Sequence, residues 1–341
     1  MFLSLLLVLL IGAVAWAGAS CGLTALFGIV LPYVAVLIFI CGLVWRMVYW
    51  AKSPVPFAIP TTGGQERSLD FIKQEKWDCP NTKFGVFVRM LLEVCLFRSL
   101  FRNTAACIHE NDPVNGGPRL VYYSSKWLWC FALIFHYCFL FVFLRHFRFF
   151  MEPVPACVSF LEAVDGFMQI GAPRFFITGG LLLVAVLFLL CRRIFNERLR
   201  YLSLMNDYFP LFLILGIVCS GLCMRYFDKC EIALVKMFIM GVTHFSPVSA
   251  EGINAMFFVH LTYVCALLIY FPFSKLTHML GVFFSPTRNL PNNTRAVRHV
   301  NPWNPPKQFL TYAEYEDLYR DAMAEAGLPL EKQPEPKKAA E

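Results

Sequence analysis

Six stretches of this 341-residue sequence are apolar over about 20 residues, the length that a helix needs to cross the hydrocarbon core of a membrane. Hydrophobic residues make up 58% of the chain and its mean hydropathy is +0.57, which is too high for a soluble globular domain. We therefore predict an all-α fold, a polytopic membrane helix bundle with about six transmembrane helices. The apolar runs lie near residues 2–19, 27–50, 127–149, 173–191, 207–226 and 256–280.

The first apolar run, MFLSLLLVLLIGAVAWAGAS, has two interpretations. Its apolar stretch ends in small residues, as a signal peptide does, but it lacks the basic segment that begins a signal peptide. We expect a retained transmembrane helix, and a cleaved signal peptide is the alternative.

Lys and Arg residues gather at one set of helix ends, which the positive-inside rule assigns to the cytoplasm. The loops at about 150–172 and 227–255 carry more acidic than basic residues and are expected outside. The C-terminus then lies in the cytoplasm. The basic ends follow the second, fourth and sixth runs and precede the third: Arg46 and Lys52; Arg192, Arg193, Arg198 and Arg200; Arg288, Arg295 and Arg298; Arg119 and Lys126.

Four of the seven histidines lie inside two of the apolar runs. An ionisable side chain in hydrocarbon is costly unless it finds a partner inside the bundle. Haem iron is a partner that binds two neutral imidazoles from facing helices. A hydrogen bond to a neighbouring helix is the alternative for any one histidine alone, but four at such positions favour two intramembrane b haems. The four are His136, His146, His260 and His278; the remaining His109, His244 and His299 fall in expected loops or tails.

The spacing of these histidines indicates how they pair. His260 and His278 are eighteen residues apart, or five helical turns, so both leave one helical face about 27 Å apart. His136 and His146 are ten residues apart, about 15 Å of rise, with the second ring about 80° round the helix from the first. Helix tilt and a bend at Pro272 must absorb this mismatch. Because the two helices run in opposite directions, His136 shares a depth with His278, and His146 with His260.

Other composition features narrow the range of functions. The thirteen cysteines contain no CxxC, CxxCH or ferredoxin-like spacing, so neither c-type haem nor iron–sulfur ligation by this chain is supported. The net charge of +7 suits contact with the lipid bilayer. No segment interleaves basic and aromatic residues as a nucleic-acid surface does, so we expect no nucleic acid among the partners.

The sequence divides into four regions. Residues 1–50 hold two N-terminal transmembrane helices, and residues 51–126 form a cytoplasmic loop. Residues 127–280 hold a four-helix haem-binding membrane core, and residues 281–341 form a cytoplasmic tail.

Two of these regions lie outside the membrane and contain helical signals. In the loop, FGVFVRMLLEVCLFRSLFRN at 84–103 places charges at i, i+4 spacing in an apolar background, as an interfacial helix on the inner leaflet does. A helix that docks a partner is the alternative. In the tail, Thr311 and Glu314 have the spacing of a capping box at the start of a short helix.

From about residue 31 to residue 285 the sequence resembles the gamma-type cytochrome b subunits of respiratory nitrate reductase. LPYVAVLIFICGLVWRMVYW is similar to that family's first helix, LFLLCRRIFNERLR to its basic inner loop, and HLTYVCALLIYFPFSKLTH to its last helix with both haem ligands. The histidine spacings of ten and eighteen are shared with it. Three features depart from that pattern: the extra N-terminal helix, the PVPFAIPTTGGQ loop and the NPWNPP tail. They resemble instead the membrane cytochrome b subunit M (DsrM) of the sulfite-reduction-associated Dsr complex.

The resemblance implies a dihaem cytochrome b subunit that takes electrons from menaquinol, the quinol being oxidised on this subunit. Two haem b groups are implied, an inner one held by His136 and His278 and an outer one held by His146 and His260. The implied partners are a cytoplasmic iron–sulfur subunit resembling heterodisulfide reductase and further subunits of a Dsr-type complex. The implied location is the cytoplasmic (inner) membrane of a prokaryote.

Other functions stay open at this point. Within the class, the chain could serve nitrate reductase or a heterodisulfide reductase. A membrane transporter also puts histidines in helices, although it usually adds intramembrane carboxylates or an internal repeat. In a structural anchor the histidines would only link helices.

The quinol site is expected in the outer loop EPVPACVSFLEAVDGFMQIGAPRFF, near the depth of His146. This loop carries Glu162, Asp165 and Arg174, and quinol oxidation needs a proton acceptor within hydrogen-bond reach. These residues are equally well explained as solvated loop charges, with Arg174 anchoring the fourth helix at the headgroups.

Overall fold

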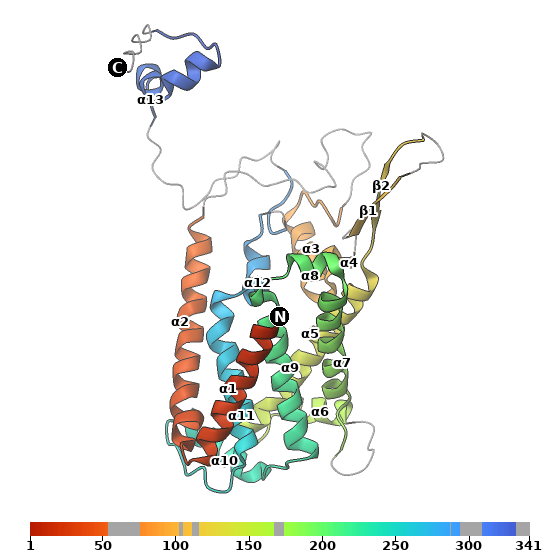
Figure 1. Cartoon of the computed structure of the whole chain (residues 1–341), viewed down its shortest axis with the longest axis vertical. Coiled ribbons are helices and arrows are strands. Elements are labelled where there is room, and N and C mark those ends of the chain that lie inside the picture. Colours follow the sequence, from red (N-terminus) through yellow and green to blue (C-terminus); the bar gives the residue numbers. More distant parts are fainter. Residues whose placement is uncertain are drawn as a thin grey trace.

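The computed structural model describes residues 1–53, 76–101, 105–110, 116–166, 174–286, 288–293 and 309–331. Within these ranges the chain is a bundle of long helices with short helices at its two ends and a hairpin at one of them (Figure 1).

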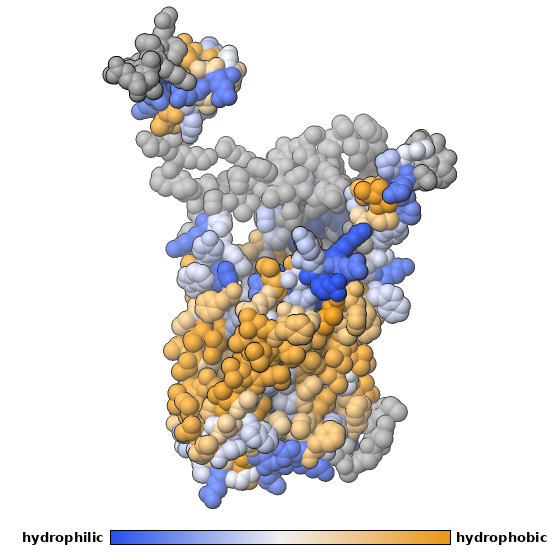
Figure 2. Space-filling view, viewed as in Figure 1, coloured by the Kyte–Doolittle hydropathy of each residue, from blue (hydrophilic) through white to orange (hydrophobic). Residues whose placement is uncertain are grey.

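Six helical segments of the described chain are long and apolar enough to cross a membrane, which confirms the predicted polytopic bundle. Their lipid-facing side chains are apolar because no water is present there to compensate polar groups. Figure 2 shows the result, a wide apolar belt between hydrophilic ends. The helices are α1 (Phe2–Ser20), α2 (Leu31–Ala51), α5 (Lys126–His146), α7 (Ile177–Phe195), α9 (Met205–Tyr226) and α11 (Ala255–Tyr270); the π-helical turn Leu26–Val30 extends α2, and the 3-10 turns Phe147–Phe149 and Phe271–Phe273 extend α5 and α11.

Helix α11 lies at the centre of the bundle, where it contacts α1, α2 and α9, while α7 packs between α5 and α9. The buried aromatic residues of α11 form much of the core. Phe258 of this helix is fully buried and lies against Phe238 of the short helix α10 (Ile232–Thr243). The core therefore joins the membrane helices to a cap at the end of the bundle opposite the chain's basic helix ends (Figure 1).

Helix α1 packs closely through a stripe of small residues that face α9 and α11, and Ser4 donates a hydrogen bond to the Met205 carbonyl at 3.1 Å. Gly12 meets the Tyr263 side chain so closely that a Cβ at this position would lie 2.1 Å from the phenolic oxygen. Helix α1 is therefore packed against the centre of the bundle along its length.

Two short helices and a hairpin lie at the end of the bundle where α2 and α11 end. They are α3 (Lys83–Leu96), α4 (Arg98–Phe101) and the antiparallel strands β1 (Ala105–His109) and β2 (Arg119–Tyr123), paired with Cys107 opposite Val121. The strands were not predicted, because the strand-like segments AACIH and RLVYY are short and no two-residue turn signal joins them. The predicted helical membrane bundle is confirmed, and the hairpin is a small addition to it.

The helix expected at 84–103 is broken. Helix α3 ends at Leu96, the next residue Phe97 has a left-handed φ of 49°, and α4 follows. The charged face of α3 points inward, where Glu93 pairs with Arg288 at 3.3 Å and burial lowers the pKa of Arg89. Its opposite face exposes four apolar residues, as expected of an interfacial helix. They are Phe84, Phe87, Leu91 and Val94.

The last apolar run does not form one helix, so the straight five-turn geometry predicted for it is wrong, although the bend expected at Pro272 is present. Proline has no N–H to continue the helical ladder, and Ser274 adopts an extended conformation (φ −115°, ψ 177°). The Ser274 hydroxyl then accepts a hydrogen bond from the Leu276 N–H at 3.2 Å and starts a new turn. The chain continues through Lys275–Thr277 into α12 (His278–Gly281).

The remaining described elements are α6 (Ala156–Asp165), α8 (Glu197–Leu202) and α13 (Tyr312–Glu325). Helix α13 begins with the predicted capping box, in which Thr311 and Glu314 exchange side-chain to backbone hydrogen bonds. Hydrogen bonds from Thr311 lower the pKa of Glu314, so the carboxylate stays ionised at neutral pH.

We predict that Gly12→Ala lowers the free energy of unfolding by about 1–3 kcal/mol, because the added methyl group overpacks the contact with Tyr263. Thermal unfolding in detergent measures this loss. Gly117→Ala is the control, since a Cβ there meets nothing within 4 Å. Equal stability of the Gly12 variant and the wild type would show that α1 does not pack tightly at this point.

Candidate functional site

The four membrane histidines come together as two pairs of facing rings. His136 of α5 and His278 of α12 have ring centroids 6.0 Å apart at an interplanar angle of 84°. His146 of α5 and His260 of α11 have centroids 6.3 Å apart with nearly parallel rings, at 10°. These are the pairs that the sequence predicted from shared depth.

The separations suit a metal ion held between two imidazoles. A metal–imidazole nitrogen bond is about 2 Å long, so two rings on opposite sides of one ion have centroids roughly 6 Å apart. In the part of the chain that the structure describes, no group of three or more His, Cys, Asp or Glu side chains could hold a metal ion. The histidines thus form two separate imidazole pairs, a donor set that would fit a bis-histidine haem.

The hydrogen bonds of the four rings also suit this ligation. His136 Nδ1 lies 2.7 Å from the Ala132 carbonyl, His146 Nδ1 lies 2.6 Å from that of Val142, and His278 Nδ1 lies 2.9 Å from that of Lys275. A carbonyl only accepts, so each Nδ1 carries the proton and each Nε2 keeps a free lone pair. Such a bond from the distal ring nitrogen is the usual way of fixing a metal-binding tautomer.

The fourth ring, His260, has the same tautomer by a different route. Its Nδ1 lies 2.9 Å from the Ser220 hydroxyl. That hydroxyl also lies 2.7 Å from the Gly216 carbonyl and donates its hydrogen there, so it accepts from the His260 N–H. Sequence reasoning missed Ser220; the signal available was a polar residue within an apolar run.

The α3–α4 junction covers the His136–His278 pair. The Phe97 ring packs edge-on against His136 with centroids 4.9 Å apart. Two side chains of α5 hold the end of α3 in place: Trp129 donates to the Leu96 carbonyl at 2.7 Å and Tyr137 to the Cys95 carbonyl at 2.9 Å. The loop region at 76–101 is thus fixed to the helix that carries two of the four histidines.

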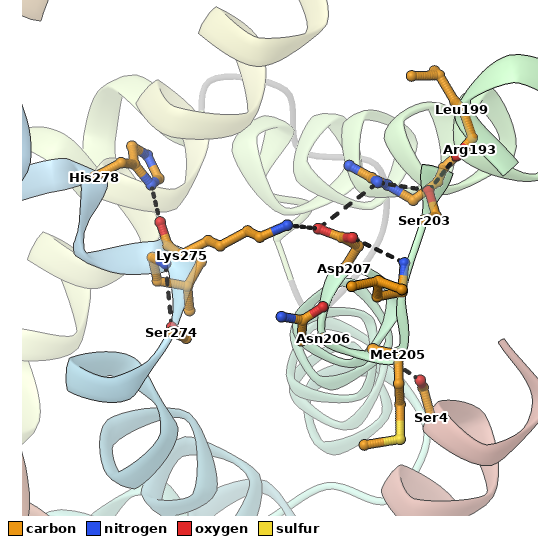
Figure 3. Close-up of polar contacts among 12 residues, drawn as sticks. Ser4, Arg193, Leu199, Ser203, Met205, Asn206, Asp207, Ser274, Lys275 and His278 are labelled. Carbon is orange, nitrogen blue, oxygen red and sulfur yellow. Dashed lines mark hydrogen bonds and ion pairs between the residues drawn. The ribbon is translucent and has the colours of Figure 1, made fainter. Parts of the chain in front are cut away.

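A polar network fixes the segment that carries His278 (Figure 3). Lys275, whose carbonyl holds the His278 ring, forms an ion pair with Asp207 of α9 at 2.7 Å. The same carboxylate accepts from the Leu204 N–H at 3.0 Å and lies 3.9 Å from Arg193 of α7. Asp207 was not among the predicted site residues, because its role depends on the break at 271–277.

The three residues expected at the quinol site lie near the other pair, with Glu162 and Asp165 on α6, which contacts α5. Glu162 pairs with Arg148 at 2.5 Å. Asp165 pairs with Arg145 at 2.8 Å and accepts two hydrogen bonds from Thr178.

Both carboxylates are therefore paired with arginines, and Glu162 is the more accessible of the two. The third expected residue, Arg174, contributes its backbone carbonyl, which accepts from Arg225 at 2.8 Å.

Two comparisons with known proteins bear on this site. The family model described as nitrate reductase gamma subunit matches residues 121–299, which include all four histidines. A protein of Archaeoglobus fulgidus named "Hdr-like menaquinol oxidoreductase cytochrome b-like subunit" is 46% identical over 288 residues, covering 82% of this chain and 84% of the relative. A protein of the same name from Archaeoglobus profundus is 44% identical over 282 residues, covering 81% of this chain and 82% of the relative.

We predict that Ser220→Ala lowers the free energy of unfolding by about 1–3 kcal/mol, because the buried Nδ1–H of His260 loses its acceptor. Unfolding in detergent, monitored by circular dichroism, measures the loss. The neighbouring Cys219→Ala is the control, since Cys219 is exposed on the same helix. A Ser220 variant as stable as this control would mean that the hydrogen bond does not hold the ring.

Proposed function

Because the chain belongs to the nitrate reductase gamma subunit family, we propose that it is a dihaem cytochrome b that carries electrons from menaquinol to a cytoplasmic iron–sulfur partner. The observation that carries the proposal is the pair of facing histidine sets, each with free Nε2 atoms at a separation that suits one iron. The name of the two Archaeoglobus relatives favours a menaquinol-linked complex over nitrate reduction.

The roles of the chain follow from the geometry of the histidine pairs. His136 with His278, and His146 with His260, would each hold one haem b, whose iron supplies reversible one-electron transfer. The carbonyl and hydroxyl partners fix the ring orientation and the tautomer. His136 and His146 lie on one helix ten residues apart, about 15 Å of rise, so the two centres connect the two halves of the membrane.

The basic helix ends support the orientation. Arg192 and Arg193 end α7, and Arg198 and Arg200 of α8 follow, at the same end of the bundle as α3 and α12. By the positive-inside rule this end faces the cytoplasm of a prokaryotic cell, so the His136–His278 centre is the inner one. The His146–His260 centre is then the outer one, and protons from the quinol leave on that side.

Glu162 is the candidate proton acceptor for the quinol. It lies on α6, at the same end of the bundle as His146, and its pairing with Arg148 leaves it partly accessible. Asp165 is less suited to this role because Arg145 and Thr178 already occupy its oxygens. Arg174 would contribute through the backbone contact with Arg225 rather than as a base.

The cytoplasmic end would dock the iron–sulfur partner of a Dsr-type or Hdr-like complex. The β1–β2 hairpin stands clear of the bundle there (Figure 1), with Ile108, Leu120 and Tyr122 exposed on one face. A two-stranded hairpin is marginally stable in water, so a partner covering this face would stabilise it. The docking segments expected from sequence, 51–83 and the tail around Trp303, lie largely outside the described residues.

We expect the purified protein to show b-type absorption bands and two haems per chain by pyridine haemochrome assay. His136→Ala and His146→Ala should each remove the haem of their own pair, because each breaks one ligand set. His244→Ala is the control, since His244 lies at the end of α10 outside both pairs. A wild-type protein without haem bands would refute the proposed function.

We also expect Glu162→Gln to slow haem reduction by a menaquinol analogue by roughly 10²-fold or more, since glutamine cannot take up the proton. Stopped-flow absorbance at the band of the reduced b haem follows this step. Glu152→Gln is the matched control, because Glu152 is a more exposed carboxylate at the same end that pairs with Lys236. Equal rates in the two variants would remove Glu162 from the quinol site.

A further inference from the structure

Arg145 directly precedes the haem-ligand candidate His146 on α5 and is buried, with only 9% of the residue exposed. Its Nη1 lies 2.8 Å from Asp165 Oδ2, and Asp165 is 3% exposed. The Thr178 N–H and hydroxyl donate to Asp165 at 2.8 and 2.6 Å. The guanidinium is therefore held in a fixed position by a carboxylate that is itself fixed by α7.

An aromatic ring adds to this constraint. The Arg145 Cζ lies 3.8 Å from the centroid of the Phe176 ring, and the Arg225 Cζ lies 4.0 Å from the same centroid. Two guanidinium groups thus share one aromatic ring, an arrangement stabilised by cation–π attraction but opposed by like-charge repulsion.

The charges of this cluster do not balance among the described residues. Arg145, Arg148 and Arg225 contribute three positive charges, and Asp165 and Glu162 contribute two negative ones. Arg145 Nε and Nη1 are both buried without a hydrogen-bond acceptor, since the 2.8 Å contact of Nη1 with Asp165 is an ion pair that lacks hydrogen-bond geometry. A buried guanidinium N–H without an acceptor is costly, so the site is short of one anionic oxygen.

We infer that Arg145 binds a propionate carboxylate of the haem held by His146 and His260, and that its charge raises the reduction potential of that haem. The inference rests on the proposed function. Haem b carries carboxylates, and a guanidinium N–H to a carboxylate is among the strongest hydrogen bonds in proteins. The unsatisfied Nε in the residue next to His146 supplies the donor.

The charges predict shifts of opposite sign. Reduction adds an electron, so a fixed positive charge favours the reduced form and a fixed negative charge opposes it. Burial limits screening by water and salt, so both effects persist at moderate ionic strength. Arg145→Gln should lower the reduction potential of the His146–His260 haem, and Asp165→Asn should raise it.

The test is a spectroscopic redox titration of the full-length chain in detergent. A His136→Ala background retains one haem and identifies its component. We expect Arg145→Gln to lower the reduction equilibrium constant of this haem at least tenfold, or 59 mV for a one-electron couple. Arg148→Gln is the matched control and should change it much less, because it removes the same charge from a more exposed site two residues beyond His146.

Three outcomes would overturn the inference: an unchanged potential in Arg145→Gln, a shift no larger than in Arg148→Gln, or shifts of the same sign in the Arg145 and Asp165 variants. Arg145→Lys keeps the charge and should stay close to the wild type.

Removing one partner of a buried ion pair is strongly destabilising. The redox titration is therefore also carried out on the double variant Arg145→Gln/Asp165→Asn, in which neither charge is left unpaired. The double variant removes both charges together but leaves the propionate without the Arg145 donor, so the reduction potential of the haem should still fall. A double variant with the wild-type potential would also overturn the inference. Absence of haem from the wild type would instead refute the proposed function, so the two failures are distinguishable.

Discussion

The structure depends on one constraint: a polar group inside the membrane must find its partner within the protein, because hydrocarbon offers none. Each of the four imidazoles meets this requirement at Nδ1, three through backbone carbonyls and His260 through Ser220. Satisfying that atom also determines the tautomer, so the Nε2 atoms remain as the unpaired groups. The same bonds that make histidine tolerable in the bundle therefore prepare it to bind a metal.

The break at residues 271–277 is explained by the same constraint. Irregular backbone at this depth is tolerated only where the protein satisfies its carbonyls. The Pro272 carbonyl accepts from Arg46 of α2 at 3.1 Å, and the Lys275 carbonyl accepts from His278. Gly42 of α2 leaves the space that the Pro272 ring occupies, since a Cβ there would lie 2.7 Å from it. The interruption thus positions a ligand candidate and is stabilised by a neighbouring helix.

The two ends of the bundle use charge differently. At the end that carries α8 and α12, Lys275 and Arg193 lie close to a single carboxylate, Asp207. At the other end, Arg145 and Arg148 are paired with carboxylates of α6, and a buried pair is costly to form and costlier to break. The Arg145–Asp165 pair is therefore buried beside one histidine pair, whereas Lys275, next to the other pair, is largely exposed to solvent.

The sequence alone determined the membrane bundle and the two histidine pairs, because hydropathy over 20 residues and the opposite directions of two helices are local or topological properties. The capping box at Thr311 is likewise encoded in a few adjacent residues. Only the tertiary structure decided the hairpin, the left-handed break at Phe97, and the contacts of Ser220, Asp207 and Arg145. These depend on which side chains meet across helices far apart in the chain, and no spacing rule within one helix records such a meeting.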